Sequence, residues 1–453
     1  MPYHVRILHV ACLVPWRSST PKVVSYNRDN SLLFLYVIYP SFAQICIFLP
    51  QGTYSLPILT RVVPQDFPLR LGRCTNVFAQ ERARTKFIIR ANKRQISIMA
   101  SDLQRTFPSA EETLKHPAYP GTLWALEPHS HGKVSVAEGR GGPVGIAWEI
   151  HGQGPVKLVL IMGLAGVKTS WQRQTKYFGH DRADKYSVLI IDNRGMGGSD
   201  KPVGVYSTSG MALDAIEVID HVGWKAERDI NLVGISMGGM IAQEVAIRIP
   251  KRLQSLSLIC TSGKVQNTKG LWETVSDTMG MIIPKSMERS IVDTALRLFT
   301  PEWLVAPDDD ILPEPGVTAR CSPPPPEGGP TYRLFETNFQ RFQAHELTKK
   351  TNPELYTTKM LMCQLAAAAL HNKTDDQLRE IADGVGSERI MIMHGKRDNM
   401  ISFPNGERLI KVLKPGSVHI VDDIGHAPII EKTQWFNSVL EEQLSMWTKP
   451  KEE

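Results

Sequence analysis

The chain contains few cysteines, and their spacing shows no pattern. Six cysteines are spread over 453 residues, at positions 12, 46, 74, 260, 321 and 363. Small secreted domains that depend on disulfides carry cysteines in regular pairs. We therefore do not expect a secreted disulfide framework, and a cytoplasmic protein is the simplest expectation.

A strongly basic surface is also missing from most of the chain. The formal net charge is +6, but residues 1–98 hold 13 Lys and Arg against 3 Asp and Glu. The remainder holds 39 basic against 43 acidic residues. Proteins that bind nucleic acid concentrate basic residues on one face. The acidic balance after residue 98 therefore predicts no nucleic-acid partner.

Long unbroken apolar runs are absent. The nearest approach, residues 32–49, is interrupted by Pro40 and Gln44 and is at the short limit for a membrane span. It also lies too far from the start for an ordinary cleaved signal peptide. We expect no membrane association unless this segment is a genuine anchor.

Residues 1–98 lack the periodicity of a folded domain. They contain isolated prolines and scattered arginines, including a basic run from Arg82 to Arg94. We expect this leader to be absent from the native protein or non-essential, with translation beginning at Met99. A mitochondrial or membrane-anchored protein is the alternative if the leader is genuine.

Recognisable cofactor motifs are absent as well. His129 and His131 are two possible metal ligands without a matching cluster, so a solvated loop is expected there. The glycines at 195, 197 and 198 do not form the G-x-G-x-x-G pattern of a dinucleotide site and are expected to form a structural turn. The sequence therefore predicts no cofactor and no metal.

One motif of catalytic type is present. Gly234-Ile-Ser236-Met-Gly238 is a G-x-S-x-G preceded by an apolar run, 230–233, and followed by a helix-forming run, 240–248. A strand, a sharp turn and a helix are the context of a nucleophile elbow. We expect the turn to present the Ser236 hydroxyl beside a helix N-terminus.

A base and an acid follow in the required order. His426 lies in a loop after a predicted strand near 418, and Asp398 directly follows the apolar run 389–395. Serine needs an imidazole to take its proton, and the imidazole needs a carboxylate to orient it. Asp422 and Asp423 are rival acids, but they lie too close to His426 in sequence to reach its ring easily.

Backbone donors complete the predicted site. The apolar strand 157–163 is followed by Leu164, whose N–H is placed to join that of Met237 in holding an oxyanion.

From about Lys133 to Leu444 the sequence resembles the α/β-hydrolase superfamily, in its cap-bearing, serine-nucleophile esterase and lipase branch. The stretches 149–155 and 192–199 resemble the turn before its third strand and the D-x-R-G-x-G-x-S loop after its fourth. The resemblance implies a Ser236, Asp398 and His426 triad with an oxyanion hole at Leu164 and Met237. Met162-Gly163 departs from the usual His-Gly.

The resemblance and the pattern of apolar runs predict an α/β fold with a mostly parallel central sheet flanked by helices. An antiparallel pair opens the sheet, and a helical cap follows the sixth strand. Expected strands lie at 134–137, 145–150, 157–163, 187–192, 229–235, 254–260 and 389–395, and expected helices near 170–178, 208–222, 238–249, 271–282, 286–299, 333–348, 353–370, 402–413 and 431–447.

Four parts of the chain follow from this pattern. They are a leader at 1–98, a first core part at 99–264, a helical cap at 265–385 and a second core part at 386–453. Within the cap, residues 307–330 hold eight prolines and cannot form a helix or a central strand. This segment is either a flexible lid loop or an artefact of an exon boundary.

The expected function is a serine hydrolase that cleaves carboxylic esters of a small or medium apolar molecule. The only hint that the substrate is apolar comes from large apolar side chains in the predicted cap. These side chains either line a pocket or form ordinary core: Trp272, Met279, Met281, Met287, Met360 and Met362. A ligand-binding, receptor-like protein is an alternative from another class. C–C bond hydrolysis, acyl transfer and peptidase activity remain open on the same residues, as does the oligomeric state.

Overall fold

The computed structural model describes residues 107–265 and 285–448, together with the backbone of three strands near the N-terminus. The chain divides into two compact units, Met1–Ile89 and Arg90–Glu453. The expected helix near 271–282 and the boundary at Met99 lie outside the described residues.

The first unit contains a small antiparallel sheet. Strands β1 (Lys22–Val23), β2 (Leu33–Tyr39) and β3 (Phe42–Phe48) are hydrogen-bonded in that order. The paired strands β2 and β3 therefore account for residues 33–39 and 42–48 of the apolar run considered above as a membrane span. Among the described residues, no helix combines the length and the apolar character needed to cross a bilayer.

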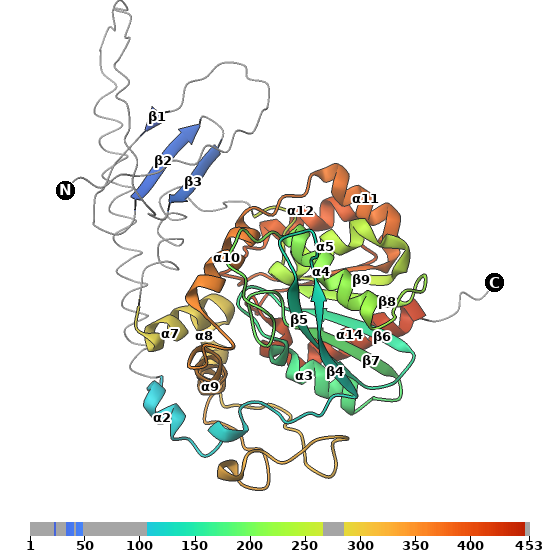
Figure 1. The fold of residues 1–453 in the computed structure, drawn as a ribbon. Coiled ribbons are helices and arrows are strands. Elements are labelled where there is room, and N and C mark those ends of the chain that lie inside the picture. Colours follow the sequence, from blue (N-terminus) through green and yellow to red (C-terminus); the bar gives the residue numbers. More distant parts are fainter. Residues whose placement is uncertain (1–21, 24–32, 40–41, 49–106, 266–284, 449–453) are drawn as a thin grey trace, which may run out of the picture. The chain divides into compact units, whose positions relative to one another are not determined.

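The second unit is built on an eight-stranded sheet (Figure 1). Its order is β11-β10-β9-β8-β6-β7-β5-β4. Strand β5 pairs antiparallel with both β4 and β7, and every other pair is parallel. The predicted fold class is confirmed. The strands are β4 (Ser130–Val136), β5 (Val144–His151), β6 (Val156–Ile161), β7 (Tyr186–Ile191), β8 (Ile230–Ile235), β9 (Leu253–Ile259), β10 (Ile390–Gly395) and β11 (Ser417–Val421).

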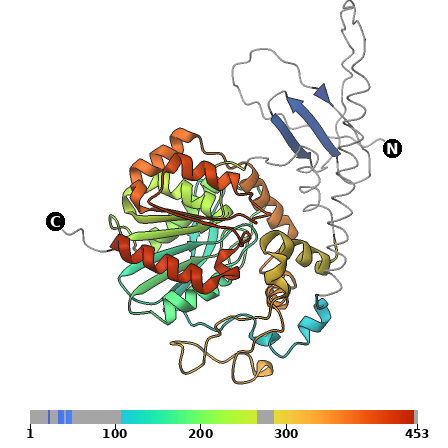
Figure 2. The same ribbon diagram turned by 180° about the vertical axis from the view of Figure 1, so that it is seen from behind.

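Helices cover both faces of this sheet, as the two opposite views show (Figures 1 and 2). One face carries α4 (Thr208–His221), α5 (Met237–Arg248), α11 (Asp375–Val385) and α12 (Pro404–Leu413). The other carries η2 (Lys168–Trp171), α3 (Gln172–Gln174), the π-helix η3 (Thr175–His180), α13 (Pro428–Glu431) and α14 (Thr433–Thr448). The helix predicted near 170–178 is thus divided among three helical geometries.

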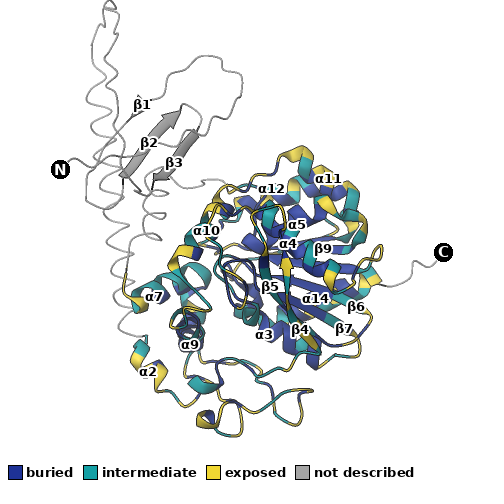
Figure 3. Ribbon diagram, in the orientation of Figure 1, coloured by how far each residue is buried: buried dark blue, intermediate teal, exposed yellow. Residues whose placement is uncertain are grey.

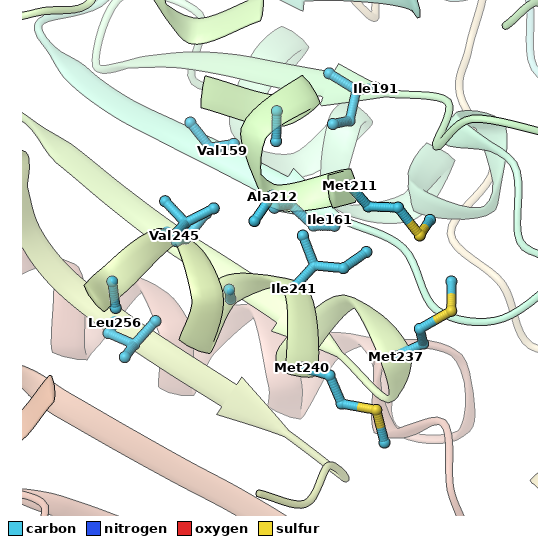
Figure 4. Close-up of a cluster of buried hydrophobic side chains, with 14 of the residues drawn as sticks. Val159, Ile161, Ile191, Met211, Ala212, Met237, Met240, Ile241, Val245 and Leu256 are labelled. Carbon is cyan, nitrogen blue, oxygen red and sulfur yellow. The ribbon is translucent and has the colours of Figure 1, made fainter. Parts of the chain in front are cut away.

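Successive side chains along a strand point to opposite faces of the sheet, so a central strand such as β10 contributes to two apolar clusters. In β10, Ile390 and Ile392 join the cluster under α5, while Met391 and Met393 join the cluster under α14. Both faces of the strand are apolar because helices cover both. Figure 4 shows the first cluster, where side chains of α4 and α5 meet those of β6, β7 and β9.

A long segment between β9 and β10, hereafter the insert, carries most of the remaining helices: α7 (Met287–Leu298), α8 (Pro301–Val305), η5 (Pro326–Gly328), α9 (Asn338–Lys350) and α10 (Thr358–Ala369). It has its own apolar cluster, which includes Phe299, Phe339 and also Ala427 of the core. Figure 3 shows α9 largely buried and α7 more exposed. Short elements complete the fold: α2 (Ala110–Leu114), η1 (Tyr119–Gly121), η4 (Pro250–Arg252) and η6 (Ser387–Arg389).

The proline-rich residues 307–330 are irregular except for η5, as their composition predicts. Ion pairs anchor the first residues of this proline-rich segment. Asp308 pairs with Arg341 at 2.6 Å, and Asp310 accepts both a 2.7 Å hydrogen bond and a second contact from Arg173. These carboxylates lie between the insert helix α9 and the core segment α3, so the segment is anchored where it begins.

Candidate active site

Ser236 lies at the turn between β8 and α5 in a backbone conformation that L-residues rarely adopt, with φ 57° and ψ −124°. Its carbonyl oxygen accepts hydrogen bonds from the N–H of Gly239 at 3.0 Å and of Met240 at 3.2 Å, and from Thr261 Oγ1 at 2.7 Å. Such a strained residue persists only when its surroundings fix it. Three donors on one carbonyl oxygen supply that fixation.

The glycines of the motif make room for this turn. A Cβ atom at Gly234 would lie 2.3 Å from the carbonyl oxygen of Gly238. A Cβ atom at Gly238 would lie 2.1 Å from the carbonyl oxygen of Ile161, at the end of β6. The first turn of α5 therefore packs directly on β6, which brings two loop regions that are distant in sequence to the same edge of the sheet.

Asp398 and His426 are in direct contact. Asp398 Oδ2 accepts a hydrogen bond from His426 Nδ1 at 2.7 Å, and Oδ1 accepts from the N–H groups of Met400 and Ile401, each at 2.8 Å. Burial would raise the pKa of Asp398, but the His426 charge and hydrogen bonds from His394 and His426 outweigh it and hold the pKa at about 2. The carboxylate is therefore ionised at neutral pH and fixes the imidazole with Nε2 outward.

The rival acids lie at the surface. Asp422 pairs with Lys396 at 2.6 Å, and Asp423 pairs with Lys432 at 2.8 Å. A contact not anticipated from the sequence is His394, whose Nε2 donates to the carbonyl oxygen of Ile401 at 2.8 Å and lies 3.3 Å from Asp398 Oδ2. The sequence feature that could have indicated this contact is the position of His394 near the end of the strand that precedes Asp398.

Insert residues hold the loop that carries His426. The N–H of His426 donates to the carbonyl oxygen of Leu298 at 2.7 Å. Glu431 accepts from the N–H of Gly425 at 2.8 Å through one carboxylate oxygen and from the N–H of Thr300 at 3.0 Å through the other. Sequence reasoning missed the contacts to Leu298 and Thr300 because they join residues more than 100 positions apart.

The predicted oxyanion donors lie beside Ser236. A Cβ atom at Gly163 would be 2.9 Å from Ser236 Cβ and 3.4 Å from Ser236 Oγ, and Leu164 is the next residue. Met237 begins α5 directly after the serine. Within residues 107–265 and 285–448, neither the N–H of Leu164 nor that of Met237 donates a hydrogen bond. Free N–H groups in the residues next to a serine hydroxyl suit a developing negative charge.

The serine hydroxyl itself is available. Ser236 is 9% exposed, and over the described part of the chain its hydroxyl forms no hydrogen bond, including none with His426. Such bonds are often long in substrate-free proteins and tighten when substrate binds. The structure therefore brings Asp398 and His426 together directly and leaves Ser236 as a separate, unbonded hydroxyl.

One group of potential metal ligands occurs among the described residues, namely Cys260, Asp398 and His426, whose ligand atoms lie within 4.8 Å of one another. Burial and the charge of Asp398 raise the pKa of the Cys260 thiol. Two of these three residues, Asp398 and His426, are hydrogen-bonded to each other at 2.7 Å. His129 and His131 were expected in a solvated loop. His129 Nδ1 accepts a hydrogen bond from the Gly152 N–H, and His131 lies in strand β4.

The glycine-rich turn after β7 is built around a carboxylate. Asp192 Oδ2 accepts from the N–H of Gly198 at 2.9 Å, and a Cβ atom at Gly197 would lie 2.2 Å from the same carboxylate. The other carboxylate oxygen of Asp192, Oδ1, accepts a hydrogen bond from the N–H of Lys168 at 2.6 Å. These contacts give the turn a structural role beside the candidate site.

Comparison with known proteins identifies the fold. A family model described as alpha/beta hydrolase fold matches residues 157–303. The solved structure of a thermophilic esterase from Thermogutta terrifontis superimposes with a TM-score of 0.52 at 18% identity, covering 71% of this chain and all of that one. Residues 157–303 thus match the α/β-hydrolase family, and the structure has the α/β-hydrolase fold. In this fold Ser236 lies at the sharp turn after a central parallel strand.

The names of two curated relatives state an enzymatic activity. 3-oxoadipate enol-lactonase 2 of Acinetobacter baylyi is 28% identical over 162 residues, which is 36% of this chain and 57% of the relative. Lipase 1 of Psychrobacter immobilis is 22% identical over 296 residues, which is 63% of this chain and 78% of the lipase. The chain thus spans less than two thirds of the length of the enol-lactonase.

Proposed function

We propose that this protein is a serine hydrolase that cleaves carboxylic esters through an acyl-enzyme on Ser236. The observation that carries the proposal is the 2.7 Å contact between His426 Nδ1 and an ionised Asp398 at the edge of the sheet that also carries the strained Ser236. A neutral imidazole held in this way is a general base, and a serine hydroxyl needs one.

The chemistry follows from the positions of four groups. His426 Nε2 takes the proton of Ser236 as the hydroxyl oxygen attacks the ester carbonyl carbon. The N–H groups of Leu164 and Met237 stabilise the oxyanion that forms. The imidazolium then gives its proton to the departing alcohol, and the acyl group stays on Ser236. His426 next activates a water molecule that cleaves this second ester and restores the serine.

The substrate is proposed to be a small molecule with an apolar acyl or alcohol part. The names of the two relatives, a lactonase and a lipase, both denote hydrolysis of an ester bond. Met162 packs against the loop at Gly166, next to the proposed oxyanion site. Met360 is core, buried beside Tyr206, and Met287 is 41% exposed. Trp272, Met279 and Met281 lie outside the described residues.

Labelling with a fluorophosphonate serine-hydrolase probe tests the proposal. We expect covalent labelling of the full chain at Ser236 and its loss in Ser236→Ala. Ser257→Ala is the matched control, because Ser257 is fully buried on β9 and its hydroxyl has no partner among the described residues. Labelling that survives in Ser236→Ala would refute the nucleophile. A folded wild-type protein that binds esters without being labelled would support the receptor-like alternative.

A substrate panel separates reaction types on the same triad. We expect p-nitrophenyl esters to be hydrolysed faster than the matching p-nitroanilides. An amide preference would point to a peptidase, and transfer of the acyl group to an added alcohol in place of water would point to an acyltransferase.

A further inference from the structure

Both backbone polar groups of Ala165, the residue after Leu164, are bonded to side chains of the insert. The Ala165 N–H donates to Gln364 Oε1 of α10 at 2.9 Å. The Ala165 carbonyl oxygen accepts from Lys349 Nζ of α9 at 3.1 Å. Ala165 has a left-handed backbone with φ 57°, which alanine adopts only at a cost. Two helices from a distant part of the chain thus fix a strained residue beside the proposed oxyanion site.

Both polar atoms of the Gln364 side chain are hydrogen-bonded within this part of the protein. Its side chain is 0% exposed, and its Nε2 donates to the carbonyl oxygen of Arg194 at 3.0 Å. Arg194 lies in the loop after β7 and forms a buried ion pair with Asp214 of α4, with contacts of 2.5 and 2.6 Å. One amide therefore ties the loop after β6 to the loop after β7.

The peptide group that carries the Leu164 N–H is held from both sides. Asn193 Nδ2 donates to the Met162 carbonyl oxygen at 2.8 Å, which fixes the preceding peptide plane, and Gln364 fixes the following one. The Gly163 carbonyl oxygen accepts from the Gly166 N–H at 3.2 Å. Because a trans peptide sets its N–H opposite its C=O, this bond directs the Leu164 N–H away from the turn.

We propose that Gln364 is a positioning residue that aligns the Leu164 N–H with the oxyanion by holding Ala165 in its left-handed conformation. This inference rests on the proposed ester hydrolysis at Ser236. The insert then contributes to the transition state through α10 in addition to any contact with substrate. An oxyanion donor acts only when aimed at the charge that develops, so a small rotation of its peptide group lowers kcat.

Gln364→Met removes both polar contacts while keeping the length of the side chain. Gln343→Met is the matched control: Gln343 is also 0% exposed on an insert helix, and its amide bonds Thr113 and the Pro108 carbonyl oxygen, on the α2 side of α9. Gln364→Asn is a milder variant that keeps a buried amide too short to reach both partners, in case the methionine variant folds poorly.

Ester kinetics give the first measurement, with the full-length chain. We expect kcat to fall about 10- to 100-fold in Gln364→Met, with KM changed less than about 3-fold and the pH dependence of kcat unshifted, because Asp398 and His426 are untouched. Gln343→Met should retain kcat within about 2-fold. A smaller loss is expected in Gln364→Asn. Equal kcat values in the two methionine variants would overturn the proposal, as would a loss confined to KM.

Amide hydrogen exchange gives a second measurement that needs no turnover. Peptides spanning residues 163–167 should exchange at least about 10-fold faster in Gln364→Met than in the wild type, and at wild-type rates in Gln343→Met. Unchanged exchange would refute the hold on Ala165. If the wild type hydrolyses no ester and takes up no fluorophosphonate, the proposed function fails, whereas the exchange result still decides whether Gln364 holds this loop.

Discussion

The N–H of His426 donates a 2.7 Å hydrogen bond to the carbonyl oxygen of Leu298, the last residue of insert helix α7. The insert therefore contacts the histidine loop through Leu298 and Thr300 and the oxyanion loop through Lys349 and Gln364. Both loops come from the core. We infer that the core alone does not fix the site, and that changes in the insert alter kcat as well as substrate preference.

Asp398→Asn should lower kcat by about 1,000-fold or more while the protein stays folded. An asparagine cannot compensate the imidazolium charge and holds the wrong imidazole tautomer. Asp423→Asn is the control, because Asp423 is an exposed partner of Lys432. Steady-state ester hydrolysis compares the two. If Asp423→Asn causes the larger loss, Asp398 is not the acid of the triad.

Gly163→Ala should lower kcat/KM by about 100-fold. The added methyl would lie 2.9 Å from Ser236 Cβ and 3.1 Å from the Ile235 carbonyl oxygen, so the serine or the oxyanion loop must shift. Gly204→Ala is a control at which the added carbon meets no atom within 4 Å. Wild-type kinetics in Gly163→Ala would show that this loop lies outside the reaction centre.

Glu431→Gln should lower both stability and kcat. The carboxylate accepts from the N–H groups of Gly425 and Thr300, and burial raises its pKa. An amide places an NH2 group against one of these donors, at a cost of about 1–3 kcal/mol in the free energy of unfolding. Displacement of Gly425 should also move His426. Urea unfolding measures the loss of stability, and ester kinetics measure the loss of kcat. A loss of stability without any change in kcat would contradict the expected effect on His426.

His371 should make stability depend on pH. Burial lowers its pKa to about 4, below the ordinary value of 6.5, and its Nδ1 contacts Thr208 Oγ1 at 2.9 Å. Between pH 6.5 and 4 the unfolded chain binds a proton that the native state does not. Stability is therefore full above pH 6.5 and falls towards pH 4, by up to about 3 kcal/mol.

Urea midpoints at pH 7 and pH 4.5 test this dependence. The difference between the two midpoints should shrink in His371→Gln and stay as in the wild type in His131→Gln, because His131 is exposed. An undiminished difference in His371→Gln would assign the pH dependence to other groups.

The pattern of apolar runs, together with the resemblance to a known superfamily, predicted the fold class. The predicted strand 229–235 and the predicted helix 238–249 agree with β8 and α5 to within one residue at each end. The region 170–178 was less predictable, because its π-helix depends on packing against β5 and β7 rather than on helix propensity. The proline-rich segment was foreseen as irregular, but its ion pairs to Arg173 and Arg341 were not.

The sequence by itself determined the motif residues, their order along the chain and the strand ends at which Ser236 and Asp398 lie, since these depend on local periodicity and turn chemistry. Only the tertiary structure decided that Asp398 contacts His426, that Asp422 and Asp423 face lysines, and that Gln364, Lys349 and Glu431 support the loops. Those contacts join residues far apart in the chain, and a buried amide or carboxylate leaves no local pattern that reveals its partner.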